Sequence, residues 1–315
     1  MSDTQPEMNT VLVPLDGSEL AERALGPAVA AVGPGGHVVL VMVPRAVGAD
    51  LAWYYAHYGA PGTVPMEYPA IEEVMAAARA EAETYLGDTE QRLARRGVRV
   101  TSVVAEELPA EAIARTAAAH GANRVAMVTH GRGGVGRWAL GSTATKLLQS
   151  ATLPVLLVRA GAERTPERIE RIDVALDGSD VAEGILAPVM ALARRHGAVV
   201  RLVHVVRTPD HKVDVDAVKL EAEITKVAET YLHEVAARLE GNGVTVTPWV
   251  TAGADVAEVL DHCATRDRAD LLAMTTHGRG GLSRWLYGSV ADRLVRHAEM
   301  PLLVLRVGDD INAGA

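Results

Sequence analysis

One block of thirteen residues occurs twice in this chain of 315 residues. The sequence THGRGGVGRWALG, from Thr129 to Gly141, returns 147 positions later as THGRGGLSRWLYG, from Thr276 to Gly288. Each copy follows an apolar, strand-like run and precedes a helix-like stretch. Glycine-rich backbone between a strand and the N-terminus of a helix is a common way to bind phosphate. The chain is therefore expected to fold as two copies of one unit, each with a candidate anion site.

The opening strand repeats as well, but with a different spacing. Asp16-Gly17-Ser18 follows its first copy and Asp177-Gly178-Ser179 its second, 161 positions later. The first half therefore carries about fourteen extra residues, which we place in a loop at about 44–68. A chain of this length favours two domains. We expect one domain over residues 1–160, a polar linker over 161–168 and a second domain over 169–315.

Strands and helices are predicted to alternate in both halves, and the predicted strands are continuous apolar runs, as in sheets covered on both faces. This pattern predicts an α/β fold of two doubly wound, flavodoxin-like or Rossmann-like domains. Each would hold a five-stranded parallel sheet in the order 3-2-1-4-5 with helices on both faces. The expected strands are Val11–Leu15, Val38–Val43, Val98–Ala105, Val125–Val128 and Val155–Val158, then Ile172–Leu176, Val199–Val206, Val244–Val250, Leu271–Met274 and Leu302–Leu305.

Composition narrows the classes of partner. The net charge of −9 arises from 31 basic and 40 acidic residues without a long basic run, which argues against nucleic acid. No apolar run is long enough to span a membrane, and residues 1–9 lack the apolar core of a secretory signal. The single cysteine, Cys263, is predicted to be a packed core thiol. Together these features favour the cytoplasm.

Ligands of doubly wound sheets lie at the carboxyl ends of the strands, where the strand order reverses. Asp16 and Asp177 end the first strands, and the glycine blocks end the neighbouring fourth strands. The aspartates therefore either face a ligand or cap the helices that follow them. Ser142 and Ser289, after the glycine blocks, either donate to phosphate oxygens or cap their own helices.

Two phosphate-binding motifs do not fit these blocks. The run Gly131–Gly136 matches G-x-G-x-x-G, but a dinucleotide fingerprint follows a first strand and needs an acidic residue about 20 positions on. The block here follows a fourth strand. Neither copy supplies the Gly-Lys-Ser/Thr of a P-loop. His130 and His277 have no carboxylate or serine placed by the sequence to form a catalytic triad.

With these motifs the chain resembles the universal stress protein family in its tandem two-domain form. The family motif is glycine, two residues, glycine, nine residues, glycine, then serine or threonine. Its latter part matches Gly131, Gly141 and Ser142, and again Gly278, Gly288 and Ser289. The position of its first glycine holds Val128 in one half and Thr275 in the other. Whether both pockets fill is therefore left open, because a β-branched residue restricts the backbone there.

The resemblance implies an ATP site in each half, with Mg²⁺ as an optional companion. The aspartates would contact the adenosine moiety, backbone at the first and second strands would line the base pocket, and the glycine blocks would hold the phosphates. The implied contacts are Pro14, Asp16, Val43, Val128, Gly131, Arg132, Gly133, Gly134, Gly141 and Ser142 in the first half, and Ala175, Asp177, Val205, Thr275, Gly278, Arg279, Gly280, Gly281, Gly288 and Ser289 in the second.

Three functions compete. The leading one is an ATP-binding stress-response regulator that couples nucleotide to conformation or assembly. The second is an enzyme of at most slow ATP hydrolysis, because the sequence shows no obvious base for phosphoryl transfer. The third is a nucleotide-free scaffold. The apolar runs Pro154–Val158 and Pro301–Leu305 would lie at sheet edges and join two chains in a homodimer, or join the two halves within one chain. No nucleic-acid or membrane partner is expected.

Overall fold

A computed structural model describes residues 9–44, 68–129, 140–159, 161, 166–208, 215–241, 243–277 and 288–307. Its strands form one ten-stranded sheet in the order β3-β2-β1-β4-β5-β10-β9-β6-β7-β8. The strands of the first half are β1 (Thr10–Leu15), β2 (His37–Met42), β3 (Arg99–Val104), β4 (Arg124–Val128) and β5 (Val155–Val158). Those of the second half are β6 (Arg171–Ala175), β7 (Val199–Arg207), β8 (Val246–Gly253), β9 (Leu271–His277) and β10 (Leu302–Val307).

Each half has the strand order predicted from the sequence. Counted within its own half, each set of five strands runs 3-2-1-4-5, and all pairs inside a half are parallel. Every predicted strand is present, with ends that shift by no more than a few residues. The flavodoxin-like fold in two tandem copies is confirmed.

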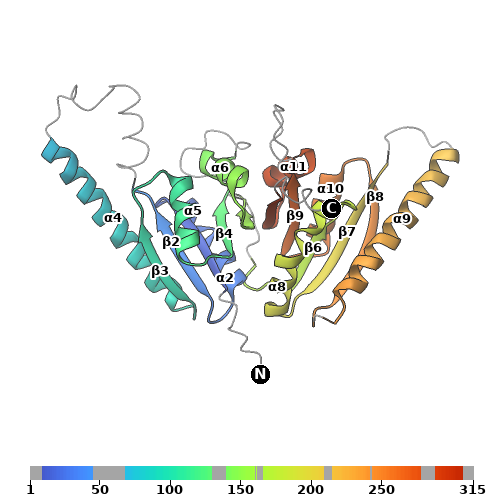
Figure 1. Cartoon of the computed structure of the whole chain (residues 1–315), viewed down its shortest axis with the longest axis horizontal. Helices are drawn as coiled ribbons and strands as arrows, with labels where there is room; N and C mark the ends of the chain where they lie inside the picture. The colour runs from blue at the N-terminus through green and yellow to red at the C-terminus, as the bar shows by residue number, and fades with distance from the viewer. Residues whose placement is uncertain are drawn as a thin grey trace, which may run out of the picture.

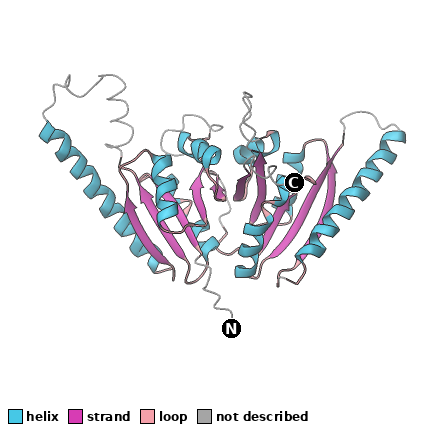
Figure 2. Ribbon diagram, in the orientation of Figure 1, coloured by secondary structure: helices cyan, strands magenta, loops and turns pink. Residues whose placement is uncertain are grey.

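Helices cover both faces of the sheet (Figures 1 and 2). The helices of the first half are α1 (Glu19–Glu22), α2 (Leu25–Val32), α4 (Tyr68–Ala94), α5 (Pro109–Ala119) and α6 (Ser142–Ser150). Those of the second are α7 (Asp180–Glu183), α8 (Leu186–His196), α9 (Val215–Leu239), α10 (Val256–Arg266) and α11 (Ser289–His297). In Figure 1 the two halves form the arms of a V, with α4 and α9 outermost.

The core lies in two layers, one on each face of the sheet. Adjacent strand residues point to opposite faces. Val11 and Val13 enter the layer under α2, α4, α8 and α9, whereas Leu12 enters the layer under α5, α6, α10 and α11. Because both faces are covered, these strands need apolar residues at nearly every position. Cys263 of α10 is buried in the second half, as predicted.

The two halves join through their last strands. β5 and β10 pair antiparallel, with Leu302 opposite Leu157, Leu303 opposite Leu156 and Val304 opposite Val155. Both core layers contain residues of both halves, so the hydrophobic core continues across this junction. Of the two arrangements expected for these strands, the structure shows the one within a single chain.

This junction corrects the expectation that Pro154–Val158 and Pro301–Leu305 are edge strands available for a homodimer. Their backbone edges are already paired with each other, so β3 and β8 are the outer strands of the sheet. The sequence marked both runs correctly as strands but does not show which partner a strand finds. The extra loop expected at about 44–68 lies mostly outside the described residues. No helix in the described ranges is long and apolar enough to cross a membrane.

A second contact between the halves involves the carboxyl ends of α2 and α8. Arg195 donates from Nε to the carbonyl of Val32 at 2.6 Å and from a terminal nitrogen to that of Pro34 at 3.2 Å. The His196 Nε2 atom lies 3.0 Å from the carbonyl of Ala31. The last carbonyls of a helix lack partners within it, and the partial negative charge of the helix dipole at this end attracts cations. α8 therefore supplies partners for the end of α2.

Candidate functional site

The carboxylate that follows β1 is held by the turn that begins α1. The Oδ1 atom of Asp16 accepts hydrogen bonds from the backbone N–H of Ser18 at 3.0 Å and from its hydroxyl at 2.5 Å. The Ser18 oxygen in turn accepts from the backbone N–H of Ala21 at 3.1 Å, which makes Ser18 the N-cap of α1. The serine, not the aspartate, therefore caps the helix, and the aspartate fixes the serine.

The second half repeats this arrangement almost atom for atom. Asp177 accepts from the backbone N–H of Ser179 at 3.0 Å and from its hydroxyl at 2.6 Å. Ser179 accepts from the backbone N–H of Ala182 at 3.1 Å and caps α7. In both halves the bonds from the serine go to the same carboxylate oxygen, Oδ1. Each aspartate is thus a pre-oriented acceptor at the carboxyl end of a first strand.

Glycine is required between each aspartate and its serine. Gly17 has a φ of 75° and Gly178 a φ of 87°. Residues that carry a Cβ atom are strained in this left-handed region, and glycine is not. This backbone turns the chain sharply from the strand into the short helix. The Asp-Gly-Ser tripeptide noticed in the sequence is therefore a structural unit, in which each residue has a different task.

The phosphate side of each predicted site begins beside this turn, because β1 pairs with β4 and β6 with β9. In the first half the backbone N–H of Gly141 donates to the carbonyl of Thr129 at 2.8 Å, which joins the end of β4 to the start of α6. α6 begins at Ser142 and α11 at Ser289, as the sequence predicted. Neither helix has a side-chain hydrogen bond from its N-cap residue, Gly141 or Gly288.

Most of each glycine block falls outside the part of the chain that the structure describes. This applies to the predicted contacts Gly131, Arg132, Gly133 and Gly134, together with Gly278, Arg279, Gly280 and Gly281. What the structure does place is the frame around them. In each half this frame consists of the end of the fourth strand, the start of the next helix and the aspartate turn.

The residues that replace the first glycine of the motif are both buried. Val128, the last residue of β4, is 6% exposed, and its side chain packs in the core layer with α2. Thr275 lies within β9 and is 9% exposed. The Val128 side chain therefore points into the protein rather than across the strand end. The steric reason for doubting a nucleotide in the first half is weaker than the sequence alone suggested.

The remaining predicted contacts line the carboxyl edge of the sheet. Pro14 lies in β1 and Ala175 ends β6, Val43 follows β2 directly, and Val205 lies within β7. All four are partly exposed. Beside Val43 a cavity of about 150 Å³ is lined by Pro44, Met75, Ala76, Arg79, Val104 and Glu106. Ligand pockets are typically ~300–1,000 Å³, so this cavity suits part of a ligand.

The two edges differ at one position next to the aspartates. Met42 ends β2, and His204 takes the corresponding place in β7. Burial lowers the pKa of His204, while a contact with the Leu176 backbone and the charge of Asp177 oppose this shift. The His204 Nδ1 atom is buried without a hydrogen-bond partner among the described residues. The two candidate sites are thus alike in backbone but not in chemistry.

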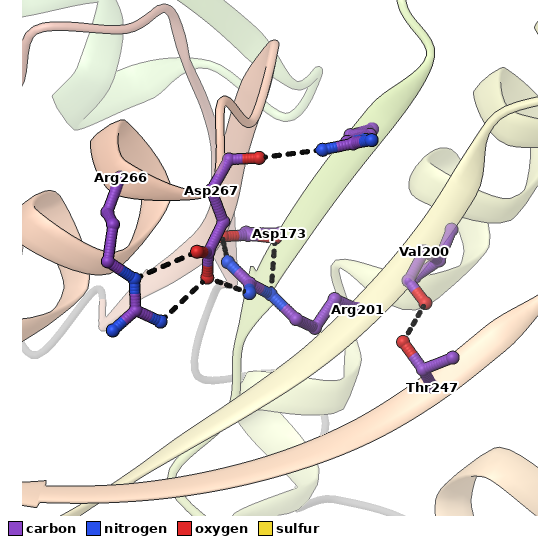
Figure 3. A network of polar contacts seen from close by, with 7 residues as sticks. Asp173, Val200, Arg201, Thr247, Arg266 and Asp267 are labelled. Carbon is purple, nitrogen blue, oxygen red and sulfur yellow. Dashed lines mark hydrogen bonds and ion pairs between the residues drawn. The ribbon is translucent and has the colours of Figure 1, made fainter.

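The sequence analysis missed a polar network inside the second half (Figure 3). Arg201 of β7 binds Asp173 of β6, with bonds of 3.0 and 2.5 Å, and also Asp267 after α10. Its guanidinium lies 4.6 Å from the ring centre of Trp249 on β8. Burial raises the pKa of Asp173, which Arg201 partly offsets. The sequence did offer a signal for this network, because Asp173 and Arg201 are charged residues within otherwise apolar strands.

Comparison with known proteins follows the same division into halves. The sequence profile of the Universal stress protein family matches residues 7–159 and again residues 168–306. The chain belongs to the universal stress protein family. Members of this family are stress-response proteins, and the tandem form predicted from the glycine blocks is confirmed.

Individual relatives agree with this assignment. The chain is 30% identical to a universal stress protein of Mycobacterium tuberculosis over 197 residues, which cover 59% of this chain and 62% of the relative. The match thus spans less than two thirds of the relative's own length. A universal stress protein from Archaeoglobus fulgidus shares the fold, with a TM-score of 0.65, 18% identity and coverage of 96% and 98%.

One solved member carries a nucleotide. The structure of a universal stress protein family protein from Arabidopsis thaliana has AMP bound. It matches 46% of this chain and 96% of its own, with 18% identity and a TM-score of 0.35.

Proposed function

We propose that this universal stress protein binds ATP at the carboxyl edge of the sheet in each half and holds it without efficient turnover. The observation that carries the proposal is the duplicated aspartate turn. Two carboxylates, each fixed by a serine that caps the following helix, lie next to strands that lead into the glycine blocks. Family membership and the AMP found in the Arabidopsis relative support the same ligand class.

The frame fits the parts of an adenine nucleotide. A carboxylate oxygen accepts from ribose hydroxyls, and the first turns of α6 and α11 present backbone N–H groups without side-chain caps, as phosphate oxygens require. The cavity beside Val43 has apolar walls at Met75 and Val104 and an ion pair between Arg79 and Glu106, and a base would contact its apolar part. Mg²⁺ would accompany the nucleotide mainly through its phosphates and water, since this ion usually keeps several waters.

Retention rather than turnover follows from what phosphoryl transfer needs. It requires a base or oriented water and a fixed charge at the γ-phosphate. In the proposed binding mode each aspartate accepts from its capping serine and from the ribose, so neither carboxylate lies at the γ-phosphate as a base. Bound nucleotide would instead stabilise the folded state by mass action and couple to conformation or assembly.

Calorimetric titration of the full chain with ATP tests the proposal. We expect two sites in the intact protein and one site in each of the variants Asp16→Ala and Asp177→Ala. Mass spectrometry of nucleotide released from freshly purified protein should give the same count. Heat without saturation at millimolar ATP in the intact chain, together with no nucleotide released, would overturn the proposal.

Hydrolysis is measured on the same samples. We expect phosphate release far slower than the roughly 1–100 s⁻¹ typical of kinases. Fast release that disappears in Asp16→Ala and Asp177→Ala would replace retention by catalysis. Fast release that persists in both would come from a contaminating enzyme.

A further inference from the structure

A glutamate ties each aspartate turn to the long helix of its half. Glu22 is the last residue of α1, and its Oε1 atom accepts from the hydroxyl of Tyr85 at 2.9 Å. Its Oε2 atom accepts from a terminal nitrogen of Arg92 at 2.9 Å. Tyr85 and Arg92 both belong to α4, seven residues apart. One carboxylate therefore holds α1 against two successive turns of α4.

A continuous series of hydrogen bonds connects this anchor to the candidate site. The hydroxyl of Ser18 donates to Asp16, and the backbone N–H of Glu22 donates to the carbonyl of Ser18 at 3.3 Å. The Glu22 carboxylate then accepts from Tyr85. α1 has only four residues and none is fully buried, although Leu20 and Ala21 pack against the core. These bonds add to that packing in fixing the position of α1 and of the aspartate before it.

The same anchor occurs in the second half, but it is incomplete. Glu183 ends α7 and accepts from Arg238 of α9 at 2.7 Å, and its backbone N–H donates to the carbonyl of Ser179 at 3.3 Å. Tyr231 occupies the place of Tyr85, and its pKa is raised first by burial, then by the charge of Glu183 and by a hydrogen-bonding contact with that carboxylate. This contact with Glu183 does not reach ordinary hydrogen-bond geometry among the described residues, whereas Tyr85 bonds Glu22 at 2.9 Å. Val235 stands where α4 has Thr89, whose hydroxyl accepts from Arg92.

We propose that Glu22 with Tyr85 positions Asp16 for nucleotide, and that the tyrosine contributes to this only in the first half. The inference rests on the proposed function, since it assigns the residues that orient the ligand-facing turn. A role in stability alone fits less well. Arg92 is 53% exposed, and ion pairs at such sites contribute little. Burial raises the pKa of Tyr85, and the bond to Glu22 adds to this shift, so the hydroxyl remains a donor.

Two matched tyrosine variants test the inference in the full-length chain. Each pocket is isolated first: Asp177→Ala leaves the first pocket, and Asp16→Ala leaves the second. In the Asp177→Ala background, Tyr85→Phe should raise the Kd for ATP about threefold to tenfold, the range of one lost hydrogen bond. In the Asp16→Ala background, Tyr231→Phe should leave the Kd unchanged. Glu22→Gln keeps an acceptor for Tyr85 but loses the charge. In the Asp177→Ala background its Kd for ATP should lie between that of the chain with Glu22 and Tyr85 intact and that of Tyr85→Phe.

A second measurement needs no nucleotide. Hydrogen exchange at the backbone amides of α1 should be faster in Tyr85→Phe than in the intact protein, while exchange in α7 should not change in Tyr231→Phe. The inference would be overturned if Tyr85→Phe had the same Kd and the same α1 exchange rate as the chain that keeps Tyr85. It would also be overturned if the two tyrosine variants had effects of the same size. If the intact chain binds no ATP, the proposed function fails by itself, and exchange alone decides whether Glu22 and Tyr85 position the turn.

Discussion

Single residues decide whether the aspartate turn can form. The sequence showed that Asp-Gly-Ser occurs twice, and the structure separates three tasks: the aspartate orients the serine, the glycine adopts the left-handed backbone, and the serine caps the helix. Sequence reasoning could not distinguish capping by Asp16 from capping by Ser18, because both residue types favour that position.

The demand for glycine in this turn can be measured directly. Gly17→Ala should lower the free energy of unfolding by about 1–2 kcal/mol, because alanine is strained at a φ of 75°. Gly87 provides the control, since it lies inside α4 with open space where a Cβ atom would go. Gly87→Ala should raise the free energy of unfolding by roughly 0.5–1 kcal/mol. Chemical denaturation measures both, and equal effects of the two variants would contradict this account.

The buried ion pair of the second half makes another prediction for single residues. Asp173 and Arg201 occupy the positions of Leu12 and Val39, which pair in the same register in the first half. Arg201→Val should destabilise the protein by about 3–5 kcal/mol, because it leaves Asp173 buried and unpaired. Asp173→Leu should cost less, since Asp267 remains as a partner for Arg201.

The double variant distinguishes an ion pair from two independent contributions. Asp173→Leu with Arg201→Val restores the apolar pair that the first half already contains. It should therefore be close to the intact protein in stability, or above it, as found for other buried ion pairs replaced by apolar residues. Additive losses in a double-mutant cycle by urea denaturation would show that the two side chains act separately.

At the scale of helices and strands, the sequence predicted more than it did for single side chains. Continuous apolar runs identified every strand, because a strand covered on both faces has almost no choice of residue type. The starts of α6 and α11 were also correct. Contacts that depend on tertiary geometry were not accessible: Glu22 and Tyr85 are 63 residues apart, and no local pattern joins them. The pairing of β5 with β10 was one of two alternatives.

Corresponding helices of the two halves differ in their N-caps, which gives a prediction at this scale. Asp255 caps α10 and accepts from the backbone N–H of Glu258 at 3.0 Å, whereas Leu108 precedes α5 without a side-chain bond and is 46% exposed. Leu108→Ser would create the sequence Ser-Pro-Ala-Glu, with Glu111 at the third helical position, which is a capping box. It should raise stability by about 1 kcal/mol.

The reverse change in the second half completes the comparison. Asp255→Ala should lower the free energy of unfolding by ~1–2 kcal/mol, because α10 loses its cap and Arg293 of α11 loses an ion-pair partner. Thermal denaturation of the two single variants measures both effects. A loss of stability in Leu108→Ser would mean that the exposed leucine side chain contributes more by packing than a cap does.

For the molecule as a whole, the decisive feature is that two domains share one sheet. Both core layers cross the β5–β10 junction, and the carboxyl end of α8 binds that of α2 beside it. A tandem chain thereby uses within itself the strand edges that its separate halves would offer to another copy. The two candidate sites are then fixed relative to each other, with α6 and α11 on the same side of the molecule (Figure 1).

This shared architecture predicts that the halves unfold together and that the α2–α8 contact helps to couple them. Arg195→Ala combined with His196→Ala removes the bonds to the carbonyls of Ala31, Val32 and Pro34 without entering either core layer. We expect a loss of roughly 1–3 kcal/mol from these bonds, and a single calorimetric transition that broadens or divides. Arg194→Ala is the control. Arg194 is an exposed neighbour on the same turn of α8, and it makes no hydrogen bond to α2 in the described structure. A double variant that melts like Arg194→Ala, in one sharp transition, would place the coupling in the β5–β10 pair and the continuous core alone.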